Sequence, residues 1–153
     1  MHDRATTSWK RRSDAAPRER QNEGGTLVPG AAPVRILIVD NDMRSADSLE
    51  RMLHSSGFSE TRVAYSGHAA LAIAADFQPA VALLELSLLD MTGYELASLL
   101  REQAQTQDLR MIALTSSPEH AAREQARAAG FERYLMKPVL ALDMRALLES
   151  AAR

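Results

Sequence analysis

A regular alternation of two hydrophobic patterns, beginning at Val34, constrains the fold of this chain more than any other feature. Short aliphatic runs, such as VRILIV and VALLE, are typical of strands that are buried on both faces. Between them lie stretches with apolar residues at helical spacing: in RSADSLERMLHSS, Ala46, Leu49 and Leu53 share one face. Five strands alternating with five helices predict an α/β fold, a doubly wound five-stranded parallel sheet with helices on both faces.

The expected elements follow one another with short connections. The strands are expected at residues 34–39, 61–65, 81–85, 109–115 and 133–136, and the helices at 44–56, 66–77, 93–103, 117–130 and from about residue 140 onward. Ser117 and Pro118 are favoured at the start of a helix, and Gly57 and Gly130 at the end of one. The third helix is expected to bury Leu96, Leu99 and Leu100. The last is expected to bury Leu140, Met144, Leu147, Leu148 and Ala151.

Composition narrows the class of protein. A chain of 153 residues that is 46% hydrophobic can form one domain, which we place at residues 34–153. Residues 1–33 are rich in Arg, Ser, Gly and Pro, and we expect a disordered tail there. The net charge of -2 favours neither a nucleic acid nor a membrane as partner. Without cysteines, a long apolar run or a secretion signal, the chain is expected to be cytoplasmic.

Polar residues stand where the expected strands end, and this is where open parallel sheets bind their ligands. The first strand ends in a cluster of acids and an amide, the third in a glutamate, the fourth in a hydroxyl and the fifth in a lysine. Carboxylates, a hydroxyl and an ammonium group in one crevice suit a hard cation together with a phosphoryl group. These residues are Asp40, Asn41, Asp42, Glu85, Thr115 and Lys137.

Four segments in order resemble the receiver domain of bacterial two-component response regulators: ILIVDND, LLELSLLDMTGYE, ALTSS and YLMKP. The resemblance covers about residues 34–153 and implies a flavodoxin-like receiver fold. It places Glu85 at the phospho-acceptor position, Asp40 and Asn41 at the acidic pair, and Gly93 at the glycine of the acceptor loop. The resemblance also implies that Thr115 and Tyr134 are switch residues and that Lys137 contacts the phosphate. It further implies that Asp40, Glu85 and Ser87 are ligands of Mg²⁺.

Three departures from the family pattern fall near the acceptor position. The family has aspartate where Glu85 stands, usually an acid at Asn41 and usually proline at Leu89. A carboxylate moved by about 1 Å can cost roughly a hundredfold in rate, and an amide lacks the charge that Mg²⁺ uses. We therefore expect weak Mg²⁺ binding and aspartyl phosphorylation that is lost or much weakened. Glu85 would instead pair with Lys137, contact Thr115 and imitate a phosphorylated aspartate.

The resemblance implies a signalling protein rather than an enzyme. The expected partners are a histidine kinase, a phosphotransfer protein, another regulator or a second copy of the chain, bound through the face from Pro118 to Ala152. Three alternatives stay open: a relic pocket that does not switch, a phosphorylation-competent receiver, and a flavodoxin-like binder of a small molecule. The last is disfavoured because no glycine-rich phosphate loop follows the first strand.

Overall fold

The computed structural model describes residues 33–116 and 128–151. The strands are β1 (Ile36–Val39), β2 (Thr61–Ala64), β3 (Val81–Glu85), β4 (Arg110–Thr115) and β5 (Arg133–Met136). The helices are α2 (Met43–Ser55), α3 (Gly67–Phe77), α4 (Gly93–Glu102) and α6 (Ala141–Ala151), with a 3-10 turn η1 (Ala104–Thr106). Residues 1–32 of the tail expected at 1–33, and residues 117–127 of the helix expected at 117–130, lie outside the described residues. The expected end of that helix lies within them, and Gly130 has the φ of 94° typical of a glycine that ends a helix.

The strands form one parallel sheet in the order β2-β1-β3-β4-β5, which confirms the expected fold class. The chain passes from β1 outward to β2 and then returns to β3 on the other side of β1. Because the connections diverge there, the crevice beyond the carboxyl ends of β1 and β3 is the expected ligand position. The residues that follow those two strands are therefore the first to examine.

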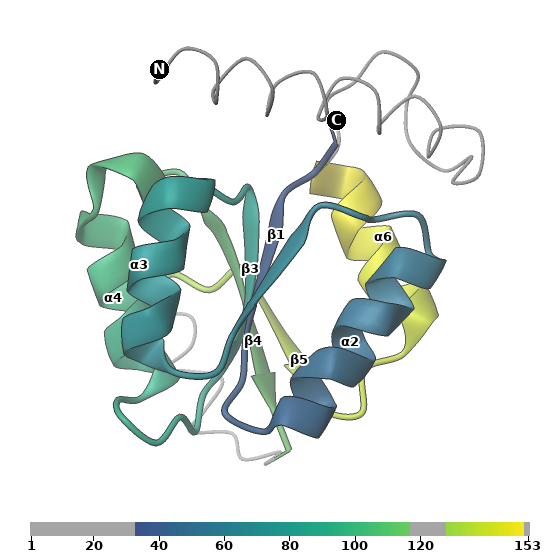
Figure 1. Cartoon of the computed structure of the whole chain (residues 1–153), viewed down its shortest axis with the longest axis horizontal. Coiled ribbons are helices and arrows are strands. Elements are labelled where there is room, and N and C mark those ends of the chain that lie inside the picture. The colour runs from purple at the N-terminus through teal and green to yellow at the C-terminus, as the bar shows by residue number, and fades with distance from the viewer. Residues whose placement is uncertain (1–32, 117–127, 152–153) are drawn as a thin grey trace, which may run out of the picture.

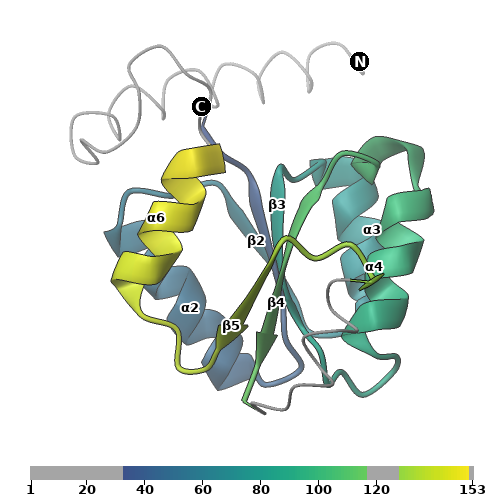
Figure 2. The same ribbon diagram turned by 180° about the vertical axis from the view of Figure 1, so that it is seen from behind.

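Helices cover both faces of the sheet (Figure 1 and, from behind, Figure 2). Helices α3 and α4 pack on the face that carries Leu37 and Leu84, whereas α2 and α6 pack on the face that carries Ile38 and Leu83. The strands β1 and β3 contribute alternate residues to the two faces and are buried along their whole length, whereas the outer strands β2 and β5 each carry an exposed arginine. This two-sided burial explains why β1 and β3 read as continuous aliphatic runs in the sequence.

Two leucines expected in the core are exposed. Helix α4 buries Leu96 and Leu100 fully, but the third position of its buried stripe is Ala97, and Leu99 is 39% exposed. Leu140 is 63% exposed because α6 begins one residue after it. The predicted helical spacing of the apolar residues was correct in both cases. The prediction was wrong in counting a leucine at the edge of the apolar face as buried. No helix within residues 33–116 and 128–151 is long and apolar enough to cross a membrane.

Candidate functional site

The ends of neighbouring strands bring the predicted polar residues to one edge of the sheet. Asp40 directly follows β1, Glu85 is the last residue of β3, Thr115 is the last residue of β4, and Lys137 follows β5. The parallel register aligns these ends, since Glu85 is opposite Leu114 on the neighbouring strand. All four residues therefore stand at the same edge.

A lysine bridges two buried carboxylates at this edge. Lys137 Nζ lies 2.6 Å from Glu85 Oε1, and it also donates to Asp40 Oδ2. Glu85 is 6% exposed and Asp40 is 2% exposed, so both carboxylates depend on this cation for compensation. The ion pair expected between Glu85 and Lys137 is present, whereas the sharing of Lys137 with Asp40 was not anticipated.

Opposing effects act on the pKa of Lys137. Burial lowers it, because desolvation disfavours the ammonium form. The hydrogen bonds from Lys137 to Asp40 and Glu85, together with the charges of these carboxylates, outweigh burial and raise the pKa above the ordinary lysine value of 10.5. Lys137 therefore carries a full positive charge at neutral pH.

Backbone amides hold the other oxygens of the two carboxylates. The Ser87 N–H donates to Glu85 Oε2 at 2.9 Å, and the Asp42 N–H donates to Asp40 Oδ1 at 3.0 Å. Each carboxylate thus has one oxygen on the ammonium group and one on the main chain. A carboxylate held at both oxygens presents its charge in one fixed orientation.

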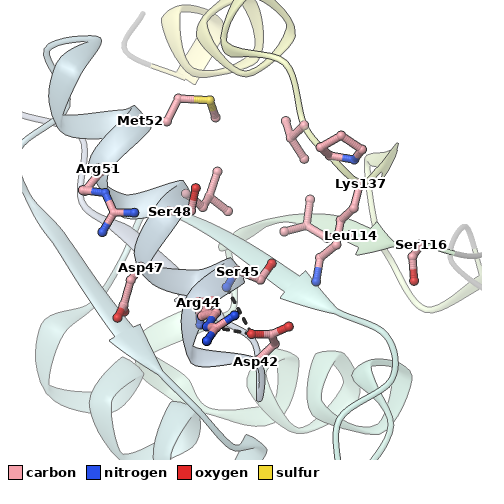
Figure 3. Close-up of a pocket in the computed structure, with 13 residues that line it drawn as sticks. Asp42, Arg44, Ser45, Asp47, Ser48, Arg51, Met52, Leu114, Ser116 and Lys137 are labelled. Atoms are coloured by element: carbon pink, nitrogen blue, oxygen red, sulfur yellow. Dashed lines mark hydrogen bonds between the residues drawn. The ribbon is translucent and has the colours of Figure 1, made fainter.

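Asp42 serves the neighbouring helix. It is the N-cap of α2, and its Oδ1 accepts from the backbone N–H groups of Arg44 and Ser45 at 3.0 and 3.2 Å (Figure 3). The sequence had placed Asp42 only in the acidic pocket, and helix capping explains why an acid stands at this position. Asn41, between Asp40 and Asp42, is partly exposed.

A groove leads from the surface to Lys137. It has a volume of about 860 Å³ and runs between α2 and the segment that follows β5 (Figure 3). Leu49, Met52 and Val139 give it apolar walls, and the ammonium group of Lys137 lies toward one end. The groove places the charged cluster within reach of solvent on the α2 side.

The two expected switch residues lie on neighbouring strands, Thr115 at the end of β4 and Tyr134 on β5. Thr115 is buried, and its carbonyl accepts from the Lys137 N–H at 2.8 Å, which ties the strand end to the lysine. Tyr134 lies on β5 and packs, partly buried, against the core on the α3 and α4 side. In that core Tyr94 meets Phe131 edge to face, and burial, followed by the proximity of Tyr134, raises the pKa of Tyr94.

Close packing requires Gly93 at the start of α4, which follows residues 86–92, the loop after the expected acceptor position, named the acceptor loop from here on. A Cβ atom on Gly93 would lie 2.6 Å from the carbonyl oxygen of Glu85 and 2.8 Å from Leu86 Cα, both of which are backbone atoms. The Gly93 N–H also donates to the Leu86 carbonyl at 2.8 Å. The first turn of α4 can approach the end of β3 this closely because residue 93 has no side chain.

Asp90 joins the acceptor loop to α3, a link that sequence reasoning missed. Asp90 accepts from the backbone N–H groups of Gly67 and His68 at 2.9 and 3.0 Å, and it pairs with His68 Nδ1 at 2.6 Å. The two backbone hydrogen bonds, with a smaller effect of the His68 ring, lower the pKa of Asp90 to about 2. The contact joins residues 23 positions apart, so no local pattern could have revealed it.

The donor set fits a tightly bound Mg²⁺ poorly. Mg²⁺ prefers octahedral oxygen ligands with carboxylate charge. Here the charges of Asp40 and Glu85 already meet an ammonium group, Asn41 is neutral, and Asp42 caps α2. Among residues 33–116 and 128–151 no three His, Cys, Asp or Glu side chains gather as a metal-binding group.

Comparison with known proteins agrees with the fold. Residues 36–149 match the family model described as the response regulator receiver domain. An uncharacterised 14.6 kDa protein of Leptolyngbya boryana is 33% identical over 118 residues, which cover 77% of this chain and 89% of that protein. The response regulator MprA of Mycolicibacterium vanbaalenii is 35% identical over 120 residues, which cover 76% of this chain and 51% of that protein.

A solved structure shows the same architecture. The CheY-like response regulator receiver domain protein of Methanospirillum hungatei has a TM-score of 0.71 and 28% identity, covering 78% of this chain and 93% of that one. The sheet, its topology and the polar edge therefore define a receiver-type α/β domain. The chain belongs to the response regulator receiver domain family of two-component signalling. It spans about half the length of the MprA regulator that it matches.

Proposed function

We propose that this protein is a pseudo-receiver that signals through protein–protein contacts, with the carboxylate of Glu85 acting in place of a phosphorylated aspartate. One observation carries the proposal: Glu85, at the acceptor position, is buried and held between the ammonium group of Lys137 at 2.6 Å and the Ser87 amide at 2.9 Å. A receiver that accepts phosphate needs that carboxylate as a nucleophile, whereas here its oxygens are already engaged.

The position of the charge supports mimicry. Glutamate extends one methylene beyond aspartate, so its carboxylate reaches toward the centre of the crevice, where a phosphoryl group would place negative charge. A fixed charge can shift an equilibrium between two conformations of a protein if it stabilises one of them more than the other. No covalent change is needed. In this account Thr115 and Tyr134 respond to the charge of Glu85 and set the binding surface.

The surface for partners includes the described part of the face from Pro118 to Ala152. Within it, Met136, Leu140 and Leu142 are large apolar side chains that are exposed to solvent. Large contiguous patches of exposed apolar side chains mark protein-binding surfaces, and we propose that these three residues contribute to one. A histidine kinase, a phosphotransfer protein or another regulator is the class of partner that we propose, and binding rather than catalysis is the activity.

Capture of partners from an extract of the native cells tests the proposal. The baits are wild type, Glu85→Gln and, as a control for removal of one acid, Glu102→Gln at the exposed end of α4. We expect wild type and Glu102→Gln to retain the same protein and Glu85→Gln to lose most of it. Equal retention by all three baits would contradict a signalling role for the Glu85 charge.

A further inference from the structure

We infer that Asp90 is a positioning residue for Glu85: it anchors the acceptor loop to α3 and so keeps the Ser87 N–H on the Glu85 carboxylate. The inference rests on the proposed function in one respect: the proposed function is the reason why the orientation of Glu85 matters for signalling. The structural link itself stands on contacts that are independent of any partner.

The first step of the link is the anchor at α3. Asp90 accepts from two backbone N–H groups in the first turn of α3, those of Gly67 and His68, and also contacts the His68 ring. The next residue, Met91, packs on Gly67, where a Cβ atom would lie 2.5 Å from the Met91 sulfur. Two consecutive residues of the acceptor loop are therefore fixed against α3, one by hydrogen bonds and one by packing.

The second step carries this anchor to Ser87. Thr92 follows Met91 and forms an antiparallel β-bridge with Ser87 across the loop. Thr92 is itself fixed by a capping box with Glu95, in which each side chain accepts the other's backbone N–H at 2.9 and 3.1 Å. The part of the loop that faces Ser87 is thus held from α3 on one side and from α4 on the other.

The last step reaches the carboxylate. The Ser87 N–H donates to Glu85 Oε2 at 2.9 Å, whereas Lys137 contacts the other oxygen, Oε1. If the loop moved away from α3, the bridge to Thr92 and then the amide of Ser87 would move with it. Glu85 would keep its ion pair with Lys137 but lose the contact that orients its second oxygen.

The chain offers a matched control, because Ser66 also caps α3. Its Oγ accepts from the Ala69 N–H at 3.1 Å, and it lies before the helix rather than in the acceptor loop. Ser66→Ala and Asp90→Ala each remove a cap from the same helix end, so a merely structural role of Asp90 would produce the same effects in both variants. Asp90→Asn keeps an acceptor oxygen and serves as the conservative variant.

The test follows the amide of Ser87 by NMR in the whole 153-residue chain at one neutral pH, without a partner. We expect the Ser87 amide to exchange about tenfold faster with solvent in Asp90→Ala than in Ser66→Ala at matched global stability, with an intermediate rate in Asp90→Asn. The Ser87 proton shift should move toward that of an unbonded amide in the same order. Equal exchange and shift in Asp90→Ala and Ser66→Ala would overturn the inference. This readout uses no partner, so it separates failure of the anchor from failure of Glu85 as a signal.

Discussion

Lys137 neutralises Glu85 at 2.6 Å while also holding Asp40, so one cation serves two buried carboxylates. The arrangement is asymmetric. Removal of either acid leaves a balanced pair, whereas removal of the lysine leaves two buried negative charges beside each other. Breaking a buried pair so that a charge remains uncompensated is strongly destabilising.

Stability should reflect this asymmetry. Lys137→Met is expected to lower the free energy of unfolding by about 3 kcal/mol, because both carboxylates lose their counter-charge. Glu85→Gln is expected to cost less than about 1 kcal/mol, since Asp40 still balances Lys137 and the amide oxygen can still accept a hydrogen bond. Urea unfolding of the two variants measures the difference. A larger loss for Glu85→Gln than for Lys137→Met would contradict the shared ion pair.

Acid should weaken the anchor at Asp90. The folded-state pKa of about 2 lies below the unfolded value of 3.8, so the ionised carboxylate stabilises the fold above the unfolded value. That contribution is lost as pH falls from about 4 toward 2. Asp90→Asn, which cannot ionise, should therefore lose less stability than wild type over this window. Chemical unfolding at pH 7, about 4 and about 3 provides the measurement, and parallel acid profiles for the two proteins would contradict the assignment.

Two glycines at the starts of helices should respond differently to alanine. At Gly93 the new Cβ would meet backbone atoms of Glu85 and Leu86, so Gly93→Ala is expected to cost about 1–3 kcal/mol. At Gly67 the Cβ would meet the flexible side chain of Met91, which can move aside, so Gly67→Ala should cost less. Urea midpoints compare the two directly. Equal losses would show that α4 does not approach β3 as closely as described.

Much of the fold was predictable because its hydrophobic patterns are local. The runs that form β1 and β3 are continuous and apolar, and Gly57 marks a helix end, so the predicted and observed positions of the described strands and helices agree within about two residues. The margins of apolar stripes were not predictable in this way. Leu99 shows why: the exact rotation of a helix depends on packing against its neighbours.

The residues of the site could be predicted from the sequence, but the full set of their contacts could not. Because the carboxyl ends of parallel strands lie at the same end of the sheet, the sequence predicted that Glu85 and Lys137 lie close together. The sharing of Lys137 with Asp40 and the anchor from Asp90 to His68 depend on tertiary geometry between distant segments. The roles of Thr115 and Tyr134 in switching remain predictions.

Mg²⁺ should bind weakly for reasons of charge. Asn41 supplies no charge, and Lys137 competes with a cation for Asp40 and Glu85. We expect amide shifts around residues 40 and 85 to show no saturation at low-millimolar Mg²⁺. Asn41→Asp adds a carboxylate and should tighten binding by roughly an order of magnitude. Saturation of the wild-type protein at low-millimolar Mg²⁺ would contradict the account of the donor set.

The affinity of the captured partner for wild type, Glu85→Asp and Glu85→Gln, with and without acetyl phosphate and Mg²⁺, tests the central claim most directly. The charge of Glu85 is expected to give wild type the highest affinity. Glu85→Asp should be intermediate because its charge is withdrawn by one methylene. Glu85→Gln should bind about tenfold more weakly, a typical coupling energy of about 1.4 kcal/mol. Acetyl phosphate should leave wild type unchanged. Equal affinities of wild type and Glu85→Gln, or tighter binding of wild type after acetyl phosphate treatment, would contradict the claim that Glu85 acts in place of a phosphorylated aspartate.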